Sequence, residues 1–355
     1  ALGLATPMSL TVAMGRGAGL GILFRNAEAI ELFREVDTLV MDKTGTLTEG
    51  RPALREIIVG EGFEEDAVLA IAAGLERGSE HPLAAAVMAA AVDRQIEIAN
   101  ITGFEAEPGL GLTGLLDRRR VVLGNELFMD TQGIAIDEDL QEVSRRRRSQ
   151  GNTVVALALD GILAGLLVIE DPVRASAVDA VQQLRSEGLR LVMLTGDNRR
   201  TAAAVAARLG IEEVIADVLP HDKLAAVRRL QQSGARVAMA GDGINDAPAL
   251  AQAEVGIAMG SGTDVAMESA DVTLVRGDLS VLAQARALSD ATVRNIRQNL
   301  FFAFVYNGIG VPIAAGALFP LLGVTLNPMI AAAAMSASSV SVITNALRLR
   351  KVRLD

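Results

Sequence analysis

The sequence has no cysteine among its 355 residues. Disulfides, thiolate metal sites and cysteine nucleophiles are therefore excluded from this chain. An excess of basic charge is also missing, since the formal net charge at pH 7 is -10. The two basic runs, 118–120 and 145–148, lie among polar and acidic residues without interleaved aromatics, which is typical of solvated surface. We therefore expect no nucleic-acid partner.

No secretory signal pattern is visible, yet half of the residues are apolar and the mean hydropathy is +0.35. Two long runs lack charge, Leu300–Leu318 and Pro328–Leu347, and each has the length of a membrane-spanning helix. Basic residues flank them on one side each, which predicts that both outer ends lie in the cytoplasm. These flanking residues are Arg294, Arg297, Arg348, Arg350, Lys351 and Arg353. A helical hairpin inside a soluble core is the alternative.

The first thirteen residues are apolar and uncharged, and Gly15-Arg16-Gly17 then breaks the run. Thirteen residues are too few to cross a bilayer. Pro7 suits a membrane helix, so we predict the tail of a spanning helix whose beginning lies outside this chain. A short buried helix is the alternative. The chain is therefore expected to be part of something longer.

Three short apolar runs with the length of buried strands each end in an acidic loop. Val36–Met41 precedes Asp42, Leu189–Leu194 precedes the loop with Asp197, and Arg236–Ala240 precedes the loop with Asp242. Helical stretches separate the later runs, and strands alternating with helices predict an α/β fold with a parallel sheet. Ligands bind such sheets outside the carboxyl ends of the strands, so we expect the three loops to converge.

The long segment between the first and second strands, 53–166, carries its own helical and strand-like stretches. It is large enough to have its own core, and we predict an inserted α+β domain.

Asp42, at a strand end before small and hydroxyl residues, can attack a phosphoryl group and form an aspartyl phosphate. A lone Asp at a turn is often only a helix cap, but two further acidic loops share this position. Phosphoryl transfer requires charge neutralisation, and Mg²⁺ on oxygen ligands supplies it. Asp242 is the expected second carboxylate ligand, with Asn245 and Asp246 ordering the site. Lys223 is a candidate for the positive charge on the phosphoryl group, although most such lysines are simply solvated.

Three motifs occur in order over two hundred residues: DKTGTLT at 42–48, TGD at 195–197 and GDGINDAP at 241–248. Together they resemble the P-type ATPases, whose phosphorylation domain has a haloacid-dehalogenase-like fold. The resemblance implies that Asp42 is the phosphorylated nucleophile and that ATP and Mg²⁺ are cofactors. It implies catalytic roles for Asp42, Lys43, Thr44, Thr195, Gly196, Asp197, Lys223, Asn245 and Asp246, and Mg²⁺ ligation by Asp42, Thr44 and Asp242.

Thr44 separates this interpretation from the soluble phosphatases of the same superfamily, which carry a second Asp two positions after the nucleophile. Without that built-in base, a phosphoenzyme should survive long enough to drive a conformational change. A membrane-anchored phosphohydrolase remains an alternative, as does a non-catalytic piece that only captures nucleotide.

Ser79-Glu80-His81-Pro82 and Gly109-Leu110-Gly111 in the inserted segment are weak signals alone. The glycine pattern 109–114 does not follow a convincing strand and is not a dinucleotide fingerprint. Together the two stretches resemble the nucleotide-binding domain of heavy-metal P-type ATPases. The resemblance implies that ATP is cradled by Glu76, His81, Gly109, Gly111 and Asn125, with His81 against the adenine.

The ion is predicted from the two apolar runs, which contain Tyr306-Asn307 and a Met-Ser-Ala-Ser-Ser stretch. Met335 and Ser339 face the same side of one helix, and a thioether beside oxygens suits Cu(I). These groups resemble the copper branch of the family, which implies transported Cu⁺ bound by Tyr306, Asn307, Met335 and Ser339, with silver tolerated. Neither run has a charged residue in its middle, which a Zn²⁺ or Cd²⁺ pump, the alternative, would be expected to have.

In that family a Cys-Pro-Cys motif directly precedes the equivalent of Ala1–Pro7, so both thiolates would lie outside this chain. The resemblance also implies an absent amino-terminal half with an actuator domain, a copper chaperone as donor, and membrane lipid around a multi-pass protein of a bacterial plasma membrane. We expect the chain alone to bind ATP but not to transport. The expected division is 1–24 helix end and extension, 25–52 phosphorylation domain, 53–167 nucleotide-binding domain, 168–290 phosphorylation domain, and 291–355 two transmembrane helices with a tail.

Overall fold

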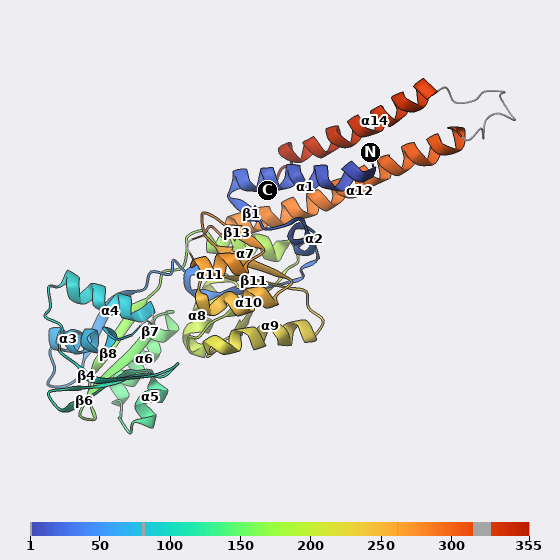
Figure 1. The fold of residues 1–355 in the computed structure, drawn as a ribbon. Coiled ribbons are helices and arrows are strands. Elements are labelled where there is room, and N and C mark those ends of the chain that lie inside the picture. The colour runs from blue at the N-terminus through green and yellow to red at the C-terminus, as the bar shows by residue number, and fades with distance from the viewer. Residues whose placement is uncertain (1, 80–81, 261, 315–327, 355) are drawn as a thin grey trace.

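The computed structural model describes residues 2–79, 82–260, 262–314 and 328–354. Two sheets and a set of long helices follow one another along the molecule (Figure 1). The first sheet has seven strands in the order β1-β13-β12-β11-β2-β9-β10, and all pairs are parallel except the edge pair of β1 and β13. Its strands are β1 (Ile22–Phe24), β2 (Thr38–Asp42), β9 (Arg190–Leu194), β10 (Glu213–Ile215), β11 (Val237–Gly241), β12 (Val255–Met259) and β13 (Val272–Leu274).

Helices cover both faces of this sheet, as the alternating sequence pattern predicted. One face packs on α2 (Ala27–Glu35), α7 (Ala177–Ser186), α8 (Arg199–Leu209) and the start of α12 (Ser280–Ala314). The other face packs on α9 (Lys223–Gln232), α10 (Ala247–Gln252) and α11 (Asp264–Ser269). β2 is an interior strand and is wholly buried, because its five residues are covered on both faces and paired on both edges.

The inserted segment forms a six-stranded antiparallel sheet in the order β3-β8-β7-β6-β5-β4. Its elements are β3 (Ala53–Val59), α3 (Glu65–Glu76), α4 (Pro82–Asp93), β4 (Thr102–Glu107), β5 (Gly111–Leu116), β6 (Arg119–Gly124), α5 (Glu126–Thr131), α6 (Glu138–Ser149), β7 (Thr153–Leu159) and β8 (Ile162–Glu170). It has its own apolar clusters, one on each face. The predicted boundary at residue 167 falls inside β8, which continues to Glu170.

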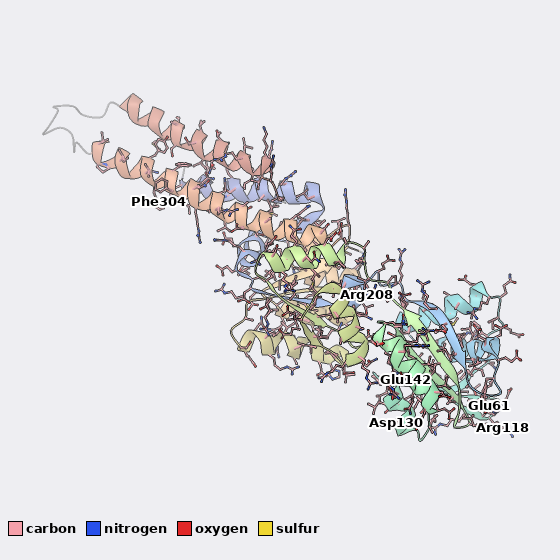
Figure 2. All side chains as sticks on the ribbon, turned by 180° about the vertical axis from the view of Figure 1, so that it is seen from behind. Glu61, Arg118, Asp130, Glu142, Arg208 and Phe304 are labelled. Atoms are coloured by element: carbon pink, nitrogen blue, oxygen red, sulfur yellow. The ribbon has the colours of Figure 1, made fainter. Side chains whose placement is uncertain are left out.

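The two arginine runs differ in their surroundings. Arg118 lies exposed at the far end of the inserted domain (Figure 2), in agreement with the solvated surface predicted for its run. Arg148 of the second run is only 7% exposed and pairs with Glu126. The prediction of a solvated run is therefore wrong for Arg148, because α6 turns this residue inward.

Three helices extend away from the first sheet: α1 (Leu2–Leu20), α12, and α14 (Pro328–Leu347), which a short turn, Arg348–Lys351, follows (Figure 1). α1 continues through Gly15-Arg16-Gly17, where the sequence predicted a break. Within the part of the chain that the structure describes, no helix has both the length and the apolar character needed to cross a membrane. This differs from the expected pair of transmembrane helices. Residues 315–318 of the first predicted span lie outside the described residues.

Candidate phosphorylation site

Asp42 is the last residue of the interior strand β2 and is 4% exposed. β2 pairs in parallel with β9 and β11, so Asp42 lies level with Leu194, and Met41 lies beside Ala240. The loops that follow all three strands therefore open at one edge of the sheet, where the sequence predicted that they would converge.

The chain after Asp42 forms a single wide turn, Lys43–Leu47. Gly45 has φ +70°, and a β-carbon there would overlap the carboxylate of Asp242. Thr44 is partly exposed, with extended backbone at φ -73° and ψ 130°. Glycine at position 45 thus allows the turn and leaves room for the second acidic loop to approach.

Lys223, at the start of α9, lies between two carboxylates. Its Nζ is 2.6 Å from Oδ1 of Asp42 and 2.7 Å from Oδ1 of Asp246. Burial alone would lower the pKa of Lys223, but the charges of Asp42 and Asp246 outweigh it and raise that pKa. The ammonium group is therefore permanently charged next to the nucleophile.

Three carboxylates gather around this lysine. Oxygens of Asp42, Asp242 and Asp246 lie within 4.8 Å of one another, which is the geometry of a metal-binding group. Burial, together with the charge of Asp246, raises the pKa of Asp42 to about 7 and that of Asp242 to about 6, although Lys223 opposes both shifts. One ammonium group does not neutralise three carboxylates, two of them buried and that of Asp242 half-buried, so a hard divalent cation such as Mg²⁺ fits this donor set.

Asp246 also organises its own loop. Its Oδ2 accepts from the backbone N–H groups of Asp242 and Gly243, both at 3.2 Å. Asn245, in the same turn, is exposed, and the structure does not bring it into this hydrogen-bond network.

The TGD loop after β9 reaches the site through Lys43. Nζ of Lys43 lies 2.5 Å from Oδ2 of Asp197, and both side chains are largely buried. Thr195 is 3% exposed and its hydroxyl accepts from the N–H of Asp197 at 3.1 Å, whereas Gly196 is exposed. Thr153 of the inserted domain also donates to Asp197, at 3.5 Å.

Sequence reasoning missed two residues where the chain returns from the inserted domain. Arg174 donates to the carbonyls of Gly45 at 2.7 Å and Thr46 at 3.1 Å. Asp171 accepts from the hydroxyl of Thr48 at 2.5 Å. The signal for them was the Asp-Pro pair directly after the apolar run of β8, which typically marks the end of a strand.

The predicted nucleotide-binding residues are partly brought together. Asn125 caps α5 by accepting from the N–H of Phe128 at 2.9 Å, and its Nδ2 donates to the carbonyl of Gly109 at 2.9 Å. Asn125 therefore shapes the glycine loop. A β-carbon at Gly111 would meet the backbone of Leu123, so glycine is required there.

Glu76 ends α3 and is 7% exposed. Burial raises its pKa, although a hydrogen bond with Ser79 opposes the shift, and Oε2 has no partner among the described residues. An orphaned buried acceptor of this kind fits a ligand that donates hydrogen bonds. His81, the remaining member of the predicted set, lies outside the described residues.

The residues predicted to bind copper lie on α12 and α14. Asn307 donates to the carbonyl of Ala303 at 2.7 Å, and Ser339 donates to the carbonyl of Met335 at 3.2 Å, each within its own helix. Tyr306 is 41% exposed and Met335 is 67% exposed. The hydrogen bonds of Asn307 and Ser339 stay within their own helices, and copper binding by these four residues stays a prediction.

The chain is similar to a known protein family, to curated proteins and to solved structures. Residues 36–254 match the family model of haloacid dehalogenase-like hydrolases. The whole chain is 57% identical to a silver-exporting P-type ATPase of Salmonella typhimurium, covering 43% of it, and 56% identical to a copper-transporting P-type ATPase of Rhizobium leguminosarum bv. viciae, covering 42%. A crystal structure of a zinc-transporting PIB-type ATPase superposes with a TM-score of 0.72 at 37% identity, over 98% of this chain and 55% of that one. The chain thus spans less than half the length of these curated relatives.

Proposed function

The chain belongs to the haloacid dehalogenase-like hydrolases and, within them, to the heavy-metal P-type ATPases, and we propose from this that it forms the catalytic part of an ATP-driven Cu(I) pump. In this proposal the pump also transports Ag(I). The remaining part of the pump is a separate amino-terminal portion with the actuator domain and the thiolates of the ion site. A copper chaperone supplies the ion, and export from the cytoplasm is the direction of transport.

The observation that carries this proposal is the surrounding of Asp42. Asp42 ends strand β2, its Oδ1 accepts a hydrogen bond from Nζ of Lys223 at 2.6 Å, and its carboxylate lies beside those of Asp242 and Asp246. Thr44 occupies the position at which a phosphatase would carry its general base. This arrangement favours formation of an aspartyl phosphate over its rapid hydrolysis.

In the proposed reaction, a carboxylate oxygen of Asp42 attacks the γ-phosphorus of ATP. The bond to the bridging oxygen breaks, and ADP leaves with the electron pair. Lys223 neutralises charge on the transferred group, and Arg174 holds the carbonyls of Gly45 and Thr46 so that the turn keeps its shape. Mg²⁺, when held by Asp42, Asp242 and Thr44, supplies further charge neutralisation.

Glu76, His81, Gly109, Gly111 and Asn125 hold the nucleotide in this proposal. Glu76 offers an acceptor without a partner among the described residues, and Asn125 keeps the glycine loop in place. The catalytic domains lie in the cytoplasm of a bacterial cell, and the whole pump is a multi-pass protein of the plasma membrane. Tyr306, Asn307, Met335 and Ser339 contribute to the Cu(I) path there.

The first test is labelling of the chain by γ-labelled ATP with Mg²⁺, compared with Asp42→Asn. We expect an acid-stable label that hydroxylamine removes and that Asp42→Asn lacks. ATP binding without label would contradict the proposed reaction, and rapid turnover of a generic phosphate ester would indicate a phosphohydrolase. In the complete pump, stimulation by Zn²⁺ instead of Cu(I) would favour a zinc transporter, the class of the structural neighbour described above.

A further inference from the structure

Four buried polar side chains lie between the three long helices. Ser9 belongs to α1, Asn295 and Asn299 to α12, and Asn345 to α14. Their exposed fractions are 0%, 6%, 0% and 6%. Burying an amide without hydrogen-bond partners costs about 1–3 kcal/mol in mutational measurements, and more on scales of transfer to an apolar medium. A buried cluster of such groups therefore requires an explanation.

The four residues form a closed ring of hydrogen bonds across the three helices. Ser9 Oγ donates to Oδ1 of Asn295 at 2.8 Å, and Nδ2 of Asn295 donates to the main-chain carbonyl oxygen of Asn345 at 2.9 Å. Nδ2 of Asn345 donates to Oδ1 of Asn299 at 3.0 Å, and Nδ2 of Asn299 donates to Oγ of Ser9 at 2.9 Å. Each member both donates and accepts, and we call this set the amide ring.

The amide ring lies between two parts of the molecule with different proposed tasks. On one side, α1 leads into β1, the edge strand of the sheet that carries Asp42. On the other side, α12 continues without interruption past Asn299 to Tyr306, about 10 Å further at 1.5 Å per residue. Figure 2 shows Phe304 on this distal part of α12.

Directional hydrogen bonds between buried side chains fix the register of packed helices. Sliding one helix by a single residue, about 1.5 Å, would break several bonds of the ring at once. Apolar contacts alone would permit such a slide, since small residues such as Ala5, Ala13 and Ala346 make up much of the interface. A buried asparagine is a well-attested device for setting helix register.

We propose that the amide ring is a register lock that makes α1, α12 and α14 respond as one body to the state of Asp42. Asn295 and Asn299 are then positioning residues, which place Tyr306, Asn307 and Met335 relative to the phosphorylation sheet. This inference rests on the proposed function for its consequence in transport, but the lock itself is a property of the three helices.

The test uses the complete pump with Asn299→Leu, which keeps the number and branching of the side-chain heavy atoms and removes the amide. Thr292→Val is the matched control, because Thr292 is also fully buried on α12 but its hydroxyl, among the described residues, bonds only to the carbonyl of Leu288 in the same helix, at 2.6 Å. For Asn299→Leu we expect the Cu(I) concentration for half-maximal phosphorylation by ATP to rise about tenfold, a 1.4 kcal/mol effect. Phosphorylation by inorganic phosphate should stay within about twofold, because Asp42 is untouched.

A second readout does not depend on metal. The chain has no cysteine of its own, so spin labels can be placed on cysteines at exposed Thr11 of α1 and Val340 of α14 in an otherwise cysteine-depleted pump. We expect one narrow distance distribution in the parent and in Thr292→Val. Asn299→Leu should shift or broaden it, as should Ser9→Ala, which adds no volume.

The outcomes separate the two proposals. Unchanged distances together with an unchanged Cu(I) requirement in Asn299→Leu would overturn the register lock. A parent pump that is labelled on Asp42 but does not respond to Cu(I) would overturn the proposed ion, while the distance measurements would still decide whether the ring holds the helices.

Discussion

Lys223 is the residue on which the charge balance around Asp42 depends. It pairs with Asp42 and Asp246, and removing a partner from a buried charge cluster costs about 3–5 kcal/mol. We expect Lys223→Gln to slow labelling by ATP by about two orders of magnitude or more, because the developing phosphoryl charge loses its fixed counter-charge.

Nucleotide binding by Lys223→Gln should remain, because the predicted nucleotide site lies in the other domain. Single-turnover labelling and equilibrium ATP binding separate these two effects. Lys351→Gln is the matched control, since Lys351 is exposed and forms no ion pair with the described residues. Labelling of Lys223→Gln at the parent rate would show that the lysine acts only structurally.

The carboxyl of Asp242 makes folding dependent on pH. Its pKa is about 6 in the folded chain against an ordinary value of 3.8, chiefly because of burial. The folded state therefore favours the protonated form, and this stabilisation is complete below about pH 4 and is lost as the pH rises through 6. Without Mg²⁺ at pH 8, Asp242→Asn should raise the free energy of unfolding by about 1–2 kcal/mol.

Urea unfolding at pH 4 and pH 8, with a chelator and then with Mg²⁺, measures this effect. The gain should vanish at pH 4, and Mg²⁺ should stabilise the parent chain more than Asp242→Asn. An equal response of both proteins to Mg²⁺ would remove Asp242 from the proposed metal site.

At the scale of elements, the two segments that connect the domains are hydrogen-bonded to each other and to the turn Lys43–Leu47, which follows Asp42. Thr48 pairs with Val173 as a bridge, and Arg174 holds the carbonyls of Gly45 and Thr46. We expect Arg174→Gln to slow labelling about tenfold with a loss of about 1–3 kcal/mol in stability, because charge-assisted hydrogen bonds to the turn disappear. Arg185→Gln should change neither quantity, because Arg185 is exposed and its contacts with Glu212 and the carbonyl of Gly210 lie at the surface.

Sequence patterns predicted the elements well where a run is apolar and continuous. They predicted poorly where a strand forms only because a neighbouring strand pairs with it. The runs of β2, β9 and β11 were found because they are continuous and buried. β4 was missed because all six of its residues are exposed and it depends on pairing with β5. The glycine pattern 109–114 does follow a strand, contrary to expectation, but it leads into β5 and not into a helix, so it is still no dinucleotide fingerprint.

The residues of the site also fall into those that the sequence predicted and those that it did not. The order of the strands predicted that the loops with Asp42 and Asp242 would meet, because parallel strands end at one edge of a sheet, whereas Lys223 was identified through the family resemblance. The contacts of Arg174 and Asp171 could not be predicted, because they depend on how the returning chain crosses the outgoing one. The amide ring joins residues nearly 300 positions apart, and no local pattern marks it.

At the scale of the whole molecule, the apolar cores of the two domains are separate. One set of buried residues belongs to the seven-stranded sheet and its helices, and another to the inserted sheet. The contacts between them include a hydrogen bond from Thr201 to the carbonyl of Asn152 at 3.1 Å and one from Thr153 to Asp197. Interfaces built from a few polar contacts leave domains able to unfold independently.

We therefore expect two thermal transitions in the chain. A non-hydrolysable ATP analogue should raise the midpoint of the inserted domain, and Mg²⁺ should raise that of the seven-stranded domain, because a ligand stabilises the unit that binds it. Calorimetry with each ligand alone distinguishes the two, and Asp242→Asn should abolish only the Mg²⁺ response. A single transition that both ligands shift equally would mean that the two connecting segments and the contact at Asp197 couple the domains into one cooperative unit. Thr153→Val should then divide it in two.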